Sequence, residues 1–155
     1  MPRNLILRER VLTADANIKP ELAAGLQVEG GDANTADLNQ VSGLNLQSRN
    51  FDYADFSGSS LPKADLRRTG LKHANLIESR LDKAKLQSSH LDGAILIGAQ
   101  LVGADLSSAH LPGAILIKAE LPDADLSGAQ LPGAALRNAQ LSGADLRYAQ
   151  LPDAD

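Results

Sequence analysis

The 155-residue chain contains no cysteine, no tryptophan and only 3% aromatic residues. The absence of cysteine excludes disulfides, thiolate metal sites, iron–sulfur clusters and cysteine nucleophiles. No run of about 18 apolar residues is present, so we expect no membrane insertion by this chain. The N-terminus also lacks the charged and then apolar layout of a secretory signal peptide. With two Phe and two Tyr, a core of this chain must consist almost entirely of aliphatic side chains.

The chain also carries little net charge. It contains 15 basic and 19 acidic residues, which gives a net charge of −4. A basic surface over the whole chain is therefore excluded, and direct nucleic-acid binding is not expected. The lack of cysteine favours the cytoplasm. It also fits a periplasmic or lumenal domain separated from its targeting segment, so the sequence leaves the compartment open.

The chain does contain a repeat with a period of five residues. From Phe51 to Leu151 every fifth residue is Leu or Phe, and we call this the central position. Two residues earlier lies a small position, which holds only Ala, Ser or Thr from Ala54 to Ala154. Five steps of about 100° leave no apolar stripe on a helix, and an odd period sends alternate side chains to opposite faces of a strand. The chain must therefore turn once in every five residues.

Proline and glycine occupy the positions that such a turn requires. Five of the seven prolines directly follow a central residue, and eight of the 13 glycines lie two places after one. Gly43 lies two places after Val41, which keeps the same five-residue phase, and makes nine. Pro112-Gly113 and Pro132-Gly133 show the pair intact. Proline and then glycine are preferred at the second and third residues of a type II turn, because Pro presets φ and Gly accepts a positive φ. Each pentapeptide is thus predicted to be a very short strand followed by a corner.

A longer period, four pentapeptides in length, overlies the shorter one. The blocks 91–110, 111–130 and 131–150 each open with Leu-x-Gly-Ala, and the first two match at 13 of 20 positions. This predicts four pentapeptides per coil, with residue i stacked on residue i + 20 at about 4.8 Å. The repeat from Phe51 onward would then form just over five coils, a rod about 25 Å long.

Units such as Ala64-Asp65-Leu66 and Ala104-Asp105-Leu106 resemble the pentapeptide-repeat family over roughly the last two thirds of the chain. The resemblance implies an all-β fold, a right-handed quadrilateral parallel β-helix, with the central and small residues pointing inward. We assign residues 41–155 to this solenoid. Residues 1–40 are expected to form an N-terminal capping segment, partly helical between Pro20 and Gly25, because an open β-helix end exposes unpaired edges. The chain stops within a repeat at its C-terminus, and we interpret it as a fragment rather than as a rod covered there by a partner.

Two columns of polar residues are candidates for metal or catalytic sites. His90 and His110 are one full longer period apart and should stack, but the column continues as glutamine, and His73 lies elsewhere. Asp105, Asp125 and Asp145 form a second column, in which each carboxylate is expected to accept a local backbone N–H bond. We therefore predict no catalytic residue, no metal site, no cofactor and no small-molecule substrate.

The candidate binding residues are isoleucines. They share one predicted face and directly precede or follow its central leucines. They are Ile77, Ile95, Ile97, Ile115 and Ile117. If the central residue points inward, its neighbours point outward and form an exposed apolar stripe, a feature of contact sites. The alternative is that β-branched residues simply suit stacked strands. We predict that this flat face binds a protein partner or another copy of the chain.

Two functions remain open at this point. The first is a non-catalytic solenoid that serves as a protein–protein interaction or structural module, in the manner of other repeat arrays, within a bacterial protein. The second follows from the family resemblance, since some members imitate B-form DNA and protect or inhibit DNA gyrase. That function calls for a strongly acidic rod. Residues 51–87, however, carry seven basic and five acidic side chains. Only residues 88–155 are clearly acidic, with eight acidic and three basic side chains.

Overall fold

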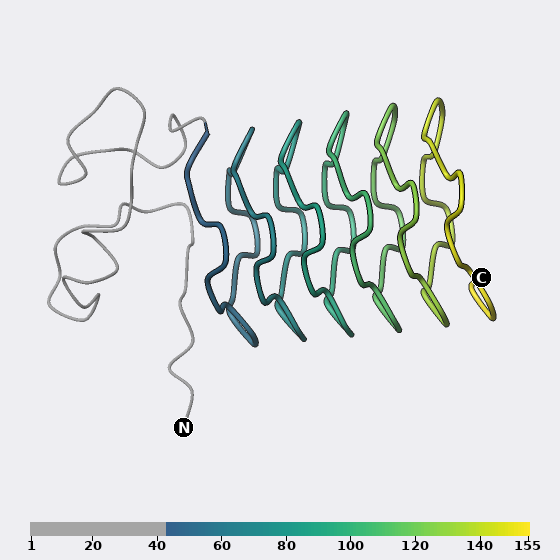
Figure 1. Ribbon diagram of the computed structural model, residues 1–155, viewed down its shortest axis with the longest axis horizontal. Coiled ribbons are helices and arrows are strands. Elements are labelled where there is room, and N and C mark those ends of the chain that lie inside the picture. Colours follow the sequence, from purple (N-terminus) through teal and green to yellow (C-terminus); the bar gives the residue numbers. More distant parts are fainter. Residues whose placement is uncertain (1–42) are drawn as a thin grey trace, which may run out of the picture.

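The chain winds into a solenoid of regularly spaced coils. The structure is a computed structural model, and it describes residues 43–155. Successive coils lie side by side in sequence order, and the C-terminus lies at the last coil (Figure 1). Each coil consists of four pentapeptides, because every bridge between neighbouring coils is parallel and joins residue i to residue i + 20. This confirms the coil length that the longer period predicts.

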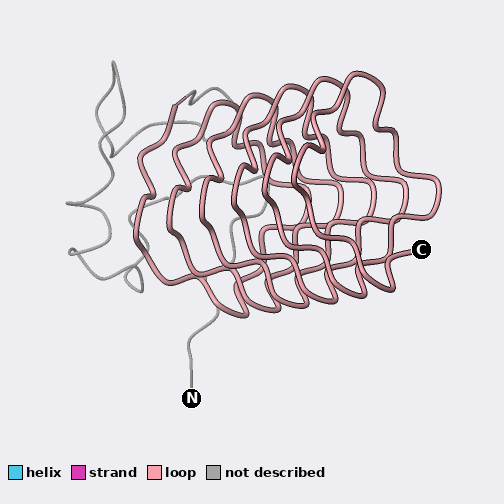
Figure 2. Cartoon of the chain, turned by 45° about the vertical axis from the view of Figure 1, so that its right-hand side comes forward, coloured by secondary structure: helices cyan, strands magenta, loops and turns pink. Residues whose placement is uncertain are grey.

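The β structure consists of isolated bridges rather than strands. Residues 43–155 contain no helix and no continuous strand, and Figure 2 accordingly draws this whole segment as loop. The bridges recur every five residues, from Asn45↔Asp65 to Gln130↔Gln150. The prediction of very short strands is corrected here to single bridging residues. The reason is the period itself, since a turn begins two residues after each bridging residue and leaves no room for a second one.

The five positions of each pentapeptide have fixed directions. In chain order we name them small, intervening, central, first turn and second turn; in one unit they are Ala94, Ile95, Leu96, Ile97 and Gly98. Small and central residues are buried through most of the rod, whereas the other three positions are half-buried or exposed. This confirms the predicted inward direction of the central and small residues. Residues i and i + 20 share a position in successive coils, and we call such a set a column.

Backbone hydrogen bonds tie each unit to both neighbouring coils. The N–H of Ile95 donates to the carbonyl of Ala74 in the preceding coil at 2.9 Å, and the N–H of Leu96 donates to the carbonyl of Ile115 in the following coil at 2.7 Å. The same pattern recurs along the rod. The buried main chain therefore satisfies its polar groups without forming a continuous strand.

The second turn position has a positive φ in every unit from residue 43 to residue 153. Nine of these residues are glycine, and the others hold φ between 53° and 63°, as the third residue of a type II turn requires. The predicted turn is thus confirmed, although glycine proves not to be necessary for it. The N–H of Lys118, for example, donates to the carbonyl of Arg137 in the next coil at 3.0 Å. Glycines at this position make the same bond, as Gly98 does to the carbonyl of Ile117 at 3.1 Å. A side chain in this left-handed conformation costs about 1 kcal/mol, and the fold as a whole bears that cost.

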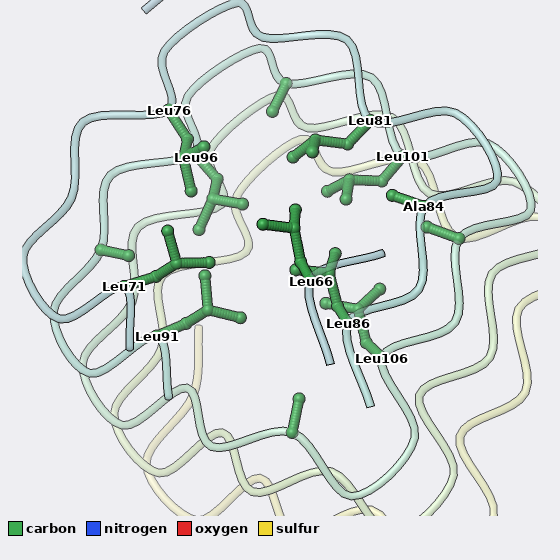
Figure 3. Close-up of a cluster of buried hydrophobic side chains, with 14 of the residues drawn as sticks. Leu66, Leu71, Leu76, Leu81, Ala84, Leu86, Leu91, Leu96, Leu101 and Leu106 are labelled. Carbon is green, nitrogen blue, oxygen red and sulfur yellow. The ribbon is translucent and has the colours of Figure 1, made fainter. Parts of the chain in front are cut away.

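The interior is filled by columns of leucine with alanine between them. In Figure 3, Leu76 and Leu96 stack on one wall, and Leu66, Leu86 and Leu106 form another stack half a coil away. The central leucines from Leu81 to Leu121 are 0% exposed. Phe51 and Phe56 meet edge to face near the start of the rod, with ring centroids 5.4 Å apart. The core therefore consists of aliphatic columns at fixed spacing, as the low aromatic content predicts.

Hydroxyl groups at the small position are accommodated by the turn. The buried Ser79 and Ser89 donate their hydroxyls to the carbonyls of Leu76 and Leu86, at 2.8 and 2.7 Å. Each accepting carbonyl belongs to the central residue three places earlier, the same group that receives the turn bond. Serine therefore replaces alanine here without leaving its polar group unsatisfied.

The structure describes the C-terminal end of the rod but not the residues that precede residue 43. The predicted capping segment of residues 1–40, with its short helix, lies outside the described residues, so its fold and its boundary at residue 41 stay predictions. In the last coil the central leucines lose part of their cover, and Leu146 is 37% exposed. Within residues 43–155 no helix has the length and apolar character needed to cross a membrane.

Candidate protein-binding face

The five isoleucines lie together on one side of the rod, which we call the isoleucine face. Ile95 and Ile115 are intervening residues that bridge to each other, and Ile77, Ile97 and Ile117 form the column of first turn residues beside them. All five are half-buried rather than fully exposed, because stacked side chains in a column cover one another. The first turn column is thus apolar over three coils and the intervening column over two of them, where most outward positions of the rod are polar.

The isoleucines replace side chains that stabilise the turn. On the same face, Asn75 occupies the intervening position and accepts the N–H of Ile77 at 3.2 Å. Isoleucine at positions 95 and 115 has no acceptor to offer, and within residues 43–155 the N–H groups of Ile97 and Ile117 have no protein hydrogen-bond partner. A hydrogen bond of this kind contributes about 1 kcal/mol. The apolar columns therefore exist at the expense of a local interaction that the fold can readily form.

Two opposite charges border the apolar columns. Glu78 and Lys118 are exposed second turn residues of the same column, separated by Gly98. Neither forms a salt bridge in the part of the chain that the structure describes. A β carbon at Gly98 would lie 3.6 Å from the Cγ of Glu78, so the Glu78 side chain extends over the glycine. The face is thus apolar in the middle, with a free anion at one end and a free cation at the other.

The aspartate column lies on the opposite side, half a coil away. Asp105, Asp125 and Asp145 each accept the N–H of the residue two places later, at 3.0, 2.8 and 3.0 Å. The expected local role of these carboxylates is therefore confirmed. Among residues 43–155 no three His, Cys, Asp or Glu side chains gather in a way that could hold a metal ion.

Two aspartates on this side accept hydrogen bonds from arginine side chains: Asp145 and, further along the same column, Asp65. Arg67 forms a double hydrogen bond with Asp65, at 2.8 and 2.5 Å, and the pKa of Asp65 lies below its ordinary value chiefly because of this bond. Arg147 holds the pKa of Asp145 down in the same way. In both pairs the arginine lies only two residues from the aspartate, so these are local contacts rather than a cluster built from distant segments.

The histidines also fall into columns, as the longer period predicts. The rings of His90 and His110 stack with centroids 5.0 Å apart, whereas His73 stacks on Tyr53 at 5.2 Å. Sequence reasoning overlooked the two tyrosines, of which Tyr53 is 53% and Tyr148 89% exposed. Both occupy the second turn position, which always points outward, so the pentapeptide phase could have identified them.

The basic region of residues 51–87 is partly neutralised within the rod. Lys72 forms a salt bridge with Asp92 at 3.6 Å, and Arg80 forms one with Asp82 at 3.7 Å. Arg67 is held by Asp65 as described above. Three of the seven basic side chains of this region are therefore already paired with carboxylates, which leaves less free positive charge than the sequence count suggests.

Comparison with known proteins agrees with this architecture. The family model for pentapeptide repeats matches the chain with 8 copies, over residues 42–76, 50–87, 84–121, 99–134 and 119–155. No curated protein sequence matches significantly.

Several solved structures match the chain as well. A pentapeptide repeat protein from the cyanobacterium Cyanothece 51142 is 30% identical, with 73% of this chain and 84% of that chain covered and a TM-score of 0.59. HetL is a pentapeptide repeat protein involved in heterocyst differentiation regulation in the cyanobacterium Nostoc sp. strain PCC 7120. It is 30% identical, with 72% of this chain and 69% of that chain covered and a TM-score of 0.42. The plasmid-mediated fluoroquinolone resistance protein QnrB1 is 20% identical, with 77% of this chain and 63% of that chain covered and a TM-score of 0.54.

Proposed function

Because the chain belongs to the pentapeptide-repeat family, whose implied fold is a right-handed quadrilateral β-helix, we propose that it serves as a non-catalytic solenoid module. It binds a protein partner through the isoleucine face. The family fixes the scaffold but not the role, since fold and function are loosely tied. The role must therefore be argued from the surface of this particular chain.

The observation that carries the proposal is the exchange made at the intervening position. Asn75 satisfies a turn N–H, and Ile95 and Ile115 in the same column give up that bond. What they provide instead is a continuous apolar surface with Ile77, Ile97 and Ile117. Each isoleucine that a partner covers contributes on the order of 1 kcal/mol. A partner that buries the face therefore recovers more free energy than the missing turn bonds cost.

Photo-cross-linking tests this proposal in the cells from which the protein comes. A photoreactive residue at position 97 is expected to give a discrete adduct, and the same residue at position 107 is the control. Ser107 holds the same first turn position on the opposite side of the rod. The double variant Ile95→Lys/Ile115→Lys should remove the adduct at position 97, because charged side chains in the neighbouring column cannot be buried in an apolar contact.

Lysine substitution in the purified protein gives a second readout. The variant Ile97→Lys/Ile117→Lys should keep the circular dichroism spectrum of the wild type and a cooperative thermal transition while association through the face is lost. Ser107→Lys/Ser127→Lys is the matched control, with the same charge, position and spacing on the opposite side. Equal adduct formation at positions 97 and 107, or association that survives the isoleucine substitutions, would show that this face is not the binding surface.

The second candidate function is a DNA-mimicking protein that protects or inhibits DNA gyrase. The acidic part of the rod favours it, since two of the three basic residues of 88–155, Arg137 and Arg147, are paired with Asp155 and Asp145. The paired and unpaired bases of residues 51–87 interrupt that acidic surface. A gyrase supercoiling assay decides between the two functions. We expect no effect on supercoiling, and inhibition or protection in that assay would reverse the order of the two candidates.

A further inference from the structure

We propose that the isoleucine face binds a second copy of this chain, with the two rods antiparallel. The two-fold axis lies between the faces, perpendicular to the rods, and passes through the coil that holds Ile97 and Gly98. This inference rests on the proposed function, because it names the partner of the same face. A two-fold interface requires that one patch be complementary to itself.

The charges at the border of the face meet that requirement. Glu78 and Lys118 lie one coil before and one coil after Gly98 in a single column, so the column is antisymmetric in charge about the glycine. They are about 10 Å apart along the rod and form no salt bridge with each other. In the antiparallel dimer Glu78 lies opposite the partner's Lys118, and the partner's Glu78 lies opposite Lys118. Two ion pairs form, and each uses a side chain that has no salt bridge within the described coils.

The apolar residues follow the same symmetry. Ile97 and Ile95 lie on the coil of the axis, so each faces its own counterpart. In the first turn column, Ile77 faces the partner's Ile117 and the reverse, so each isoleucine of that column meets an isoleucine. In the intervening column, Ile115 faces the partner's half-buried Asn75. Gly98 carries no side chain where the two rods approach at the axis. Two copies of residue 98 therefore do not collide there, and the side chain that reaches toward this level is that of Glu78.

The size of the face sets the expected strength. Three isoleucines in one column and two in the next, with a charged border, form a small interface, and small interfaces give weak association. We therefore expect a dissociation constant in roughly the 10–100 µM range. Sedimentation velocity from about 1 µM to about 1 mM spans that range. Wild-type protein that stays monomeric up to about 1 mM would overturn the inference.

Charge reversal tests both the partner and the orientation. Glu78→Lys and Lys118→Glu each place like charges opposite each other and should weaken self-association roughly tenfold. In an equimolar mixture of the two variants, the heterodimer restores both ion pairs, so association should return to the wild-type level. Glu120→Lys, on the next face, is the control and should associate as the wild type does. Variants that associate normally alone, or a mixture that shows no gain, would contradict the antiparallel arrangement.

Single cysteines give an independent measure of the register, because the chain has none of its own. Ile97→Cys lies beside the axis and should join to itself through a short bis-maleimide. Glu78→Cys and Lys118→Cys should each react poorly alone and cross-link efficiently when mixed. The reverse result, efficient self-linking at positions 78 and 118, identifies a parallel dimer and overturns the proposal.

The outcomes also separate this inference from the proposed function. If the chain stays monomeric while position 97 forms an adduct with a different protein in cells, the face binds a partner but not a second copy. If the chain dimerises and Ile97→Lys/Ile117→Lys has no effect, another surface forms the dimer and this inference falls, whereas the proposed function is still decided by the adduct at position 97. Absence of both the dimer and the adduct likewise overturns both.

Discussion

The isoleucine face and the aspartate column are built on the same backbone, and they differ at the intervening position. Asp125 accepts the N–H of Ser127 at 2.8 Å and so closes its turn locally. Within residues 43–155, Ile95 leaves the N–H of Ile97 without a protein acceptor and presents a branched apolar side chain instead. An aspartate at the intervening position therefore satisfies a turn N–H, whereas an isoleucine there adds apolar surface.

This comparison shows that the inward positions determine the fold, whereas the outward positions determine the chemistry of the surface. Burial of the central and small residues holds each coil to the next, whatever stands at the intervening position. The bridge Asp105↔Asp125 and the bridge Ile95↔Ile115 have the same parallel geometry despite opposite chemistry. A repeat of this kind can thus vary its outer surface without changing its fold, which is why the role has to be sought in departures from the commonest outward residues.

The largest expected effect contrasts an inward residue with its outward neighbour. Leu96→Ala removes a side chain that is 0% exposed and should lower the free energy of unfolding by about 3 kcal/mol. Ile95→Ala, one residue earlier and half-buried, should lower it by only about 1 kcal/mol. Urea denaturation followed by circular dichroism measures both values. Equal losses would mean that the outward column contributes as much to the fold as the core does.

An exchange between the two sides should have a smaller effect. Asp125→Ile leaves the N–H of Ser127 without its acceptor and should cost about 1 kcal/mol of unfolding free energy. Ile95→Asn supplies an acceptor to Ile97, as Asn75 does for Ile77, and should change stability by less than about 1 kcal/mol while weakening association. Chemical denaturation and sedimentation velocity measure the two quantities separately. A large loss of stability in Ile95→Asn would show that the isoleucine serves the fold rather than a partner.

The smallest effect concerns pH on the side of the aspartate column. Arg67 lowers the pKa of Asp65, so the folded protein favours the carboxylate over the unfolded chain. Its contribution to stability is present above the unfolded pKa and is lost as the pH falls through the folded pKa. Arg67→Gln should raise the NMR titration midpoint of the Asp65 carboxyl. Arg68→Gln, at the next residue, should not, because Arg68 has no salt bridge within residues 43–155. A midpoint unchanged by Arg67→Gln would show that the contact is absent in solution.

Much of the fold followed from residue spacing. The inward positions, the turn after each central residue and the stacking of His90 on His110 were all predicted from the two repeat periods, and the structure confirms them. The expectation that glycine marks the positive-φ position was too narrow, because Lys118 and Glu78 hold that conformation as well. Composition at one position could not reveal this, since bonds to the next coil hold the turn in the same conformation whether glycine or another residue occupies it.

The sequence by itself determined the coil, because a strict period of five with alternating small and large inward residues permits only a turn at every unit. It also placed the five isoleucines on one side, since equivalent residues of successive coils must stack. Only the tertiary structure decided what those residues present to a partner. Half-burial of the isoleucines and the absence of salt bridges at Glu78 and Lys118 within residues 43–155 depend on atoms from neighbouring coils. Local spacing fixes the direction of a side chain, whereas its remaining capacity to bind depends on which neighbours have already satisfied it.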